Sequence, residues 1–208
     1  MPTKPVVPGY TPHSKAHIKG TIIISDSTPG RIKSWVLNEN IDSTKESIIM
    51  KKYPGATAAE IAHNAIIPFS EIGPSQVIIM AGTNDIGKAN RTKSAINEFM
   101  IVDDILKIAA LAKVYGAEKV IVSSLLIRRG YRNQSAVNRI NVLLSKQCRE
   151  QGYSFLDHGN VKMVHIASDG LHLNDFGINI LKMNFLCCCS TFTWEKCNFI
   201  SDFANALS

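Results

Sequence analysis

The chain has 208 residues, of which 45% are hydrophobic and 19% are charged. This length and composition fit one globular α/β domain with a full hydrophobic core, and they exclude an intrinsically disordered protein. The formal net charge of +6 would suit an anionic ligand or nucleic acid as a partner. No dense tract of Lys and Arg occurs, so the charge alone defines no such site.

Residues 1–19 are rich in proline and have no long apolar core, so we expect a loose N-terminal leader and not a secretory signal peptide. The apolar runs are far shorter than the roughly 20 residues that a membrane-spanning helix needs. These features predict an intracellular, cytoplasmic protein with no transmembrane segment. The five cysteines have neither CxxC nor Cys/His spacing, so we expect no metal site.

Five apolar segments predict strands, at residues 21–25, 47–55, 75–85, 118–125 and 153–158. Apolar residues at helical spacing follow each of them, around 32–36, over 56–67 up to a break at Pro68, and over 91–115, 134–152 and 178–186. Continuously apolar strands that alternate with helices indicate a parallel sheet covered on both faces. We therefore predict a three-layer α/β/α sandwich with a five-stranded parallel sheet. The domain is expected to span 20–186, with a C-terminal tail at 187–208.

Polar and glycine residues gather where the predicted strands end. In an open parallel sheet, ligands bind outside the carboxyl ends of the strands, so these residues are the candidates for a functional site. They are Ser25, Asp26 and Ser27 after the first strand, Gly55 after the second, Gly82 to Asp85 after the third, Arg128 and Arg129 after the fourth, and Asp169 and His172 after the fifth.

The chemistry of these residue types is that of a serine hydrolase. Ser27 is a poor nucleophile until a base removes its proton, and His172 is the candidate base. Asp169, three residues earlier, is placed to hold the imidazole in one tautomer and to stabilise its cation. The backbone N–H groups of Ser27 and Gly55 and the side-chain amide of Asn84 would supply an oxyanion hole.

Each of these residues also has an ordinary structural interpretation. Ser27 after a strand is typical of a helix N-cap, and we expect it to lie at a helix N-terminus. Asn84 and the Pro54–Gly55 pair are typical of turns. Arg128 and Arg129 either guide an anionic substrate or belong to a solvated loop. It is the order of the residues at one sheet edge that favours the catalytic interpretation.

The order Ser, Gly, Asn, His resembles the SGNH (GDSL-type) hydrolase superfamily. The nucleophile motif Gly-Asp-Ser is matched by "SDS" at residues 25–27, with Ser25 in the place of the glycine. The second-block glycine is matched by Gly55, the third block Gly-x-Asn-Asp by "GTND" at 82–85, and the last block Asp-x-x-His by Asp169 and His172. The resemblance covers about residues 20–186 and implies a flavodoxin-like SGNH hydrolase fold.

The resemblance implies a serine esterase that acts on small acyl esters or lipid-like esters, with no cofactor. Its catalytic residues would be Ser27, Asp169 and His172, and its oxyanion hole would be Ser27, Gly55 and Asn84. The alternative is a catalytically idle module of the same fold that binds RNA or a protein partner. The chain is also similar to esterase-like domains in open reading frames of some non-LTR retrotransposons, which would fit nucleic acid as a partner.

Overall fold

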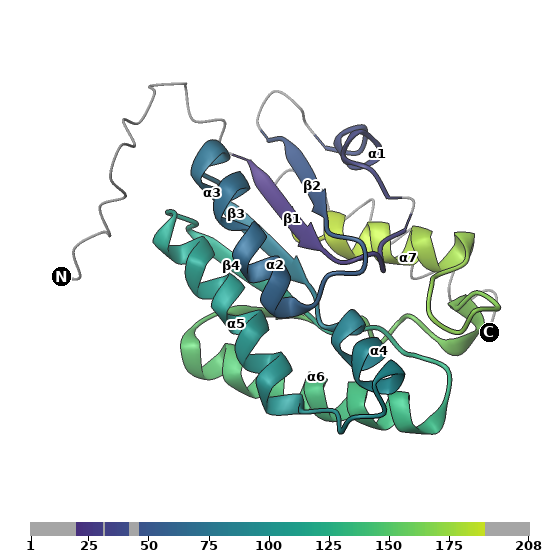
Figure 1. Cartoon of the computed structure of the whole chain (residues 1–208). Coiled ribbons are helices and arrows are strands. Elements are labelled where there is room, and N and C mark those ends of the chain that lie inside the picture. The colour runs from purple at the N-terminus through teal and green to yellow at the C-terminus, as the bar shows by residue number, and fades with distance from the viewer. Residues whose placement is uncertain (1–19, 31, 42–45, 190–208) are drawn as a thin grey trace.

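Five parallel strands form the centre of the structure, a computed structural model that describes residues 20–30, 32–41 and 46–189 (Figure 1). The strands are β1 (Thr21–Ser25), β2 (Ile48–Lys52), β3 (Gln76–Met80), β4 (Lys119–Ser123) and β5 (Ser154–Leu156), in the order β2-β1-β3-β4-β5. Every pair of neighbours in this sheet is parallel, which confirms the predicted fold class. The predicted leader and residues 190–208 of the predicted tail lie outside the described residues.

The two central strands are buried along their whole length, because helices cover both faces of the sheet. Successive side chains of a strand point to opposite faces. Ile22 and Ile24 accordingly pack in one hydrophobic cluster, and Ile23 packs in the cluster on the other face. The uninterrupted isoleucine run of β1 therefore serves two separate core layers.

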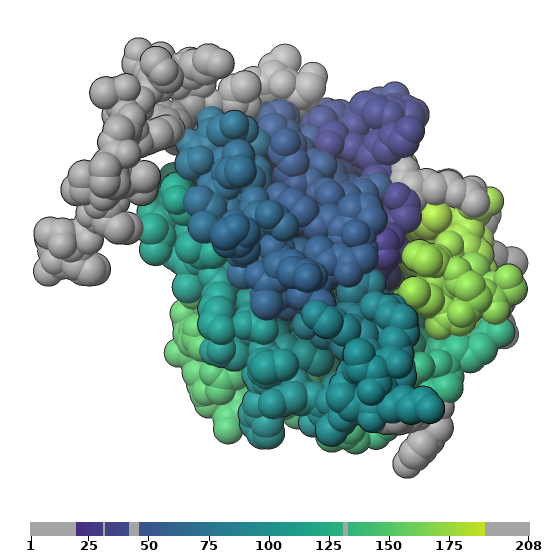
Figure 2. All heavy atoms as spheres, in the orientation of Figure 1, coloured from purple at the N-terminus to yellow at the C-terminus, as the bar shows by residue number. Residues whose placement is uncertain are grey.

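The helices divide unequally between the two faces. The Ile22 face carries α2 (Ala58–Asn64), α3 (Ile66–Ile72), α4 (Thr83–Arg91), α5 (Glu98–Val114) and α6 (Tyr131–Gln151), and the other face carries α1 (Ser34–Asn38) and α7 (Asp175–Leu186). In Figure 2, the blue and teal atoms of α2 to α5 form a closely packed surface over the first face. The three predicted layers are confirmed.

Two predictions about the helices are wrong. Pro68 does not break a helix, because it lies in the first turn of α3, where a missing N–H removes no intrahelical bond. The "GTND" segment is not a turn between strand and helix but the start of α4, which ends at Arg91. A separate helix, α5, then begins after Asn97, whose side chain accepts a hydrogen bond from the Met100 N–H at 3.1 Å.

The strand order reverses its direction next to β1. From β1 the chain crosses to β2 on one side of the sheet and then returns to β3 on the other side of β1. The carboxyl ends of β1 and β3 therefore lie side by side at a topological switch point, where sheets of this kind bind their ligands. Among the helices of the described residues, none is long and apolar enough to cross a membrane.

Candidate active site

The turn after β1 is built around the buried carboxylate of Asp26. Its Oδ1 atom accepts hydrogen bonds from the Thr28 N–H at 2.8 Å and from the Thr28 hydroxyl. Burial raises the pKa of Asp26, while the Thr28 donors, the nearby Thr83 N–H and the charge of Arg128 oppose that rise. The Asp26 N–H also donates to the Met80 carbonyl at 3.1 Å, which fixes the turn against the end of β3.

Ser27 follows in this turn and is half-buried. The prediction that it lies at a helix N-terminus is wrong, because α1 begins only at Ser34 and its N-cap is Lys33. The Ser27 carbonyl accepts the Gly30 N–H at 3.0 Å, which closes a turn at Pro29–Gly30 instead. Because Asp26 holds the N–H and hydroxyl of Thr28, the turn does not depend on the Ser27 hydroxyl as a cap.

Ser25, which stands where the resemblance expects glycine, is fully buried as the last residue of β1. Its carbonyl accepts the Tyr53 N–H at 2.8 Å and so joins the end of β1 to the segment after β2. By the alternation of the strand, its side chain shares a face with Ile23, toward α1 and α7. The serine side chain is therefore accommodated without displacing the strand from the sheet.

The segments after β2 and β3 are joined by two side chains of the "GTND" block. Asn84 donates from Nδ2 to the Ala56 carbonyl at 3.0 Å, and Asp85 Oδ2 accepts the Ala58 N–H at 2.9 Å. The first bond brings the Asn84 amide next to the residue that follows Gly55. Burial raises the pKa of Asp85 to about 6, although the Ala58 N–H favours the carboxylate.

Asp169 and His172 form a hydrogen-bonded pair in the loop before α7. His172 Nδ1 lies 2.7 Å from Asp169 Oδ2, and Asp169 Oδ1 accepts the N–H groups of Leu171 and His172 at 2.8 and 2.9 Å. The His172 side chain and these backbone donors lower the pKa of Asp169 to about 2. An ionised Asp169 accepts a hydrogen bond from the Nδ1 proton of His172, so the neutral ring has its free electron pair on Nε2.

The two arginines after β4 contact the site in different ways. The Arg128 guanidinium is buried and donates from Nη1 to the Thr83 carbonyl at 2.6 Å. The Arg129 N–H donates to the Gly170 carbonyl at 3.0 Å, and its side chain reaches the Ser168 carbonyl at 3.5 Å. Contact of either arginine with a substrate stays a prediction.

The structure thus brings most of the predicted residues to the carboxyl edge of the sheet. Within the described residues, no direct hydrogen bond joins Ser27 Oγ to His172, and His172 Nε2 has no partner. The functional pairing of these two residues stays a prediction, and so does the oxyanion role of Ser27, Gly55 and Asn84.

Sequence reasoning missed a serine–histidine contact at the ends of β4 and β5. His158 Nε2 lies 2.6 Å from Ser123 Oγ, and His158 Nδ1 lies 2.8 Å from Asn184 Nδ2. Ser123 Oγ also donates to the Ser124 carbonyl at 3.1 Å, so it accepts from the Nε2 proton of a neutral imidazole. Both side chains are buried, which indicates a structural network. Polar residues directly after two neighbouring strands were the signal available in the sequence.

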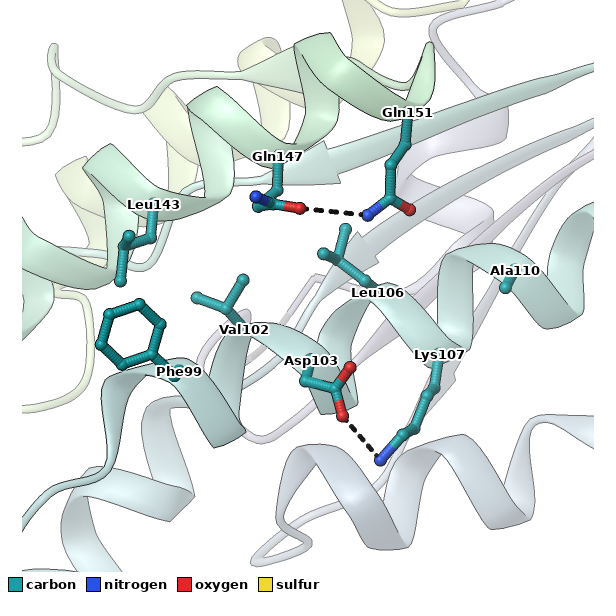
Figure 3. Close-up of a pocket in the computed structure, with 9 residues that line it drawn as sticks. All are labelled: Phe99, Val102, Asp103, Leu106, Lys107, Ala110, Leu143, Gln147 and Gln151. Carbon is teal, nitrogen blue, oxygen red and sulfur yellow. Dashed lines mark hydrogen bonds and ion pairs between the residues drawn. The ribbon is translucent and has the colours of Figure 1, made fainter.

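A hollow of about 330 Å³ lies between α5 and α6, away from this edge. Figure 3 shows the side chains of Phe99 and Leu143 facing one another across it, with an Asp103–Lys107 ion pair on its rim. None of its lining residues is a candidate for catalysis. In the part of the chain that the structure describes, no cluster of three or more His, Cys, Asp or Glu side chains could hold a metal ion.

Solved structures with a similar fold include a lipase, a putative acylhydrolase and an esterase by name. A GDSL-like lipase from Bacteroides thetaiotaomicron is 18% identical, with a TM-score of 0.64 over 80% of this chain and 85% of that one. A putative acylhydrolase from Bacteroides fragilis is 18% identical, with a TM-score of 0.65 over 84% and 88%. An acetyl xylan esterase, AlAXEase, is 12% identical, with a TM-score of 0.71 over 81% and 98%.

The sequence itself matches no protein-family model and no curated protein. The similarity to solved structures therefore concerns the fold. The chain has the α/β fold of GDSL-like lipases and acetyl xylan esterases, as the motif order predicted.

Proposed function

We propose that the protein is a serine esterase that hydrolyses small acyl esters. Ser27 is the nucleophile, His172 is the general base and Asp169 orients the imidazole. The observation that carries the proposal is the 2.7 Å contact between His172 Nδ1 and Asp169 Oδ2. This contact leaves Nε2 as the basic nitrogen, in a loop that Arg129 ties to the carboxyl edge of the sheet.

The reaction follows from these assignments. His172 Nε2 takes the proton of Ser27 Oγ while Oγ attacks the ester carbonyl, and Asp169 stabilises the imidazolium that results. The imidazolium then gives this proton to the leaving alkoxide, so an alcohol departs and an acyl-enzyme remains. A water molecule, deprotonated by the same nitrogen, cleaves the acyl-enzyme and returns Ser27 to its hydroxyl form.

We assign the Asn84 amide and the N–H groups of Ser27 and Gly55 as the donors that stabilise the oxyanion of the tetrahedral intermediate. Asn84 Nδ2 carries two hydrogens, and its bond to the Ala56 carbonyl uses one of them. The other supports its role as a donor. Gly55 has a φ of +80°, a conformation that favours glycine, and no atom lies within 4 Å of the position of an added Cβ. Open space there supports the approach of a ligand.

The test is hydrolysis of p-nitrophenyl esters graded from acetyl to octanoyl, together with labelling by a fluorophosphonate that traps activated serines. We expect the wild-type protein to hydrolyse the short esters and to be labelled. Ser27→Ala should abolish both, because it removes the atom that forms the acyl-enzyme. Ser27 is half-buried and caps no helix, so its loss should change stability by about 1 kcal/mol or less.

Ser145→Ala is the matched control, since Ser145 is a half-buried serine on α6 outside the proposed site. This variant should keep full turnover and labelling. A wild-type protein that neither hydrolyses nor labels would contradict the proposed function. Labelling that persists in Ser27→Ala would show that a different serine reacts.

A further inference from the structure

Three buried polar atoms beside the proposed site lack a hydrogen-bond partner: Ser25 Oγ, Asp26 Oδ2 and Arg128 Nε. Unpaired polar atoms in a protein interior are costly and are uncommon, so a group of them next to a reactive serine calls for a physical reason. Two of these atoms carry opposite charge. Residue Arg128 is 9% exposed and residue Asp26 is 1% exposed.

Arg128 contacts the residue that precedes Asn84, and its charge affects the residue that precedes Ser27. Its Nη1 atom donates to the carbonyl of Thr83 at 2.6 Å, and Thr83 directly precedes Asn84. Its charge also favours the ionised form of Asp26, and Asp26 directly precedes Ser27. The nearby Thr83 N–H also favours the ionised form of this carboxyl.

The backbone of the arginine segment is fixed independently of the guanidinium. The Arg128 N–H donates to Gln134 Oε1 at 2.9 Å, at the start of α6. The Arg129 N–H donates to the Gly170 carbonyl at 3.0 Å, one residue after Asp169. These two hydrogen bonds hold the backbone of residues 128 and 129, from which the Arg128 side chain reaches the Thr83 carbonyl.

We propose that Arg128 is a positioning residue that holds the oxyanion segment at Thr83–Asn84 against the turn carrying Ser27. The inference rests on the proposed function for its catalytic meaning. A guanidinium suits this task because it presents several donors in a planar fork and stays charged. The Asp26 carboxyl accepts the Thr28 N–H and hydroxyl, which holds the nucleophile turn in place.

The alternative is that Arg128 binds the substrate directly. A guanidinium this buried, with Nη1 already bonded to a backbone carbonyl, has little surface to offer a ligand. The two roles differ in kinetics. A positioning residue changes kcat for every ester, whereas a substrate contact changes KM for anionic esters only.

The experiment compares Arg128→Met and Arg128→Lys on p-nitrophenyl acetate, which is neutral, and on p-nitrophenyl hemisuccinate, which is anionic. For Arg128→Met we expect kcat to fall about 10- to 100-fold on both esters, because a displacement of about 1 Å in a catalytic group can cost about 100-fold. KM should change less than about 2-fold. Arg128→Lys keeps the charge but loses the fork, so its kcat should lie between those of Arg128→Met and the wild type.

Hydrogen exchange of peptides covering 25–30 and 81–86 gives a second measurement that needs no turnover. Both peptides should exchange faster in Arg128→Met than in the wild type, because the Arg128–Thr83 hydrogen bond and the positive charge near Asp26 are lost. Arg139→Met is the matched control, since Arg139 is an exposed arginine on α6 paired with Glu98 on α5. It should leave kinetics and both peptides unchanged.

The outcomes separate the two proposals. A wild-type protein without esterase activity would refute the proposed function, and hydrogen exchange would still test the contact made by Arg128. Unchanged kcat and unchanged exchange in Arg128→Met, or a rise in KM confined to the hemisuccinate, would refute the positioning role. If Arg128→Met does not fold, Arg128→Lys keeps the buried charge and still tests the role: wild-type kcat on both esters together with unchanged exchange of both peptides would refute it.

Discussion

Protonation of His158 should destabilise the fold in a defined range of pH. The ring is 4% exposed, with Ser123 Oγ at 2.6 Å from Nε2 and Asn184 Nδ2 at 2.8 Å from Nδ1. Asn184 Nδ2 is a donor, so Nδ1 of the neutral ring must accept. The ring cannot take its second proton at Nδ1 without losing this hydrogen bond. Burial lowers the pKa of His158 from 6.5 to about 4.

The size of the effect follows from that pKa. Between pH 6.5 and about 4 the unfolded chain binds a proton at His158 that the folded chain does not. Stability therefore falls as the pH is lowered through this range, and the loss is complete near pH 4. At roughly 1.4 kcal/mol for each pH unit, the total loss from His158 is about 3 kcal/mol.

The measurement is the free energy of unfolding in urea at pH 7 and at pH 4, for the wild type and for His158→Gln. Glutamine does not titrate, so the decrease between the two pH values should be about 3 kcal/mol smaller in the variant. Asp85, whose raised pKa of about 6 makes an opposite contribution, is present in both proteins and cancels in the comparison. His63→Gln, at an exposed histidine, should keep the wild-type decrease. Equal decreases in the wild type and His158→Gln would refute the reasoning.

The remaining predictions concern single contacts. Asn84→Ala should lower kcat on p-nitrophenyl acetate about 100- to 1000-fold while circular dichroism stays native, and near-normal turnover would mean that Asn84 is no oxyanion donor. Thr57→Ala removes the capping box that Thr57 forms with Glu60 at the start of α2, so urea unfolding should show a loss of about 1 kcal/mol. Gly170→Ala would place a Cβ 2.8 Å from Arg129 Cβ, at a residue whose φ of +73° favours glycine. The melting temperature and the turnover should therefore both fall, and unchanged values would show that the loop adjusts freely.

The sequence by itself determined the class of fold, and it predicted candidate site residues whose catalytic roles stay predictions. β-Branched runs such as Ile22 to Ile24 are buried on both faces, and such runs predict the strands of a covered parallel sheet. The Asp169–His172 contact is also local, since the two residues are three positions apart in one loop. Local patterns of this kind depend on the residues themselves and on their spacing along the chain.

The tertiary structure decided which polar residues make buried contacts between distant segments. Arg128 and Thr83 are 45 residues apart, and Ser123 and His158 are 35 apart. Their contacts exist because parallel pairing puts the carboxyl ends of distant strands at one edge, and no local pattern encodes these pairings. The sequence predicts that Arg128 follows a strand in a loop, but it does not show that the residue is buried. A charged group removed from water requires hydrogen-bond partners, and the folded chain supplies one in the Thr83 carbonyl.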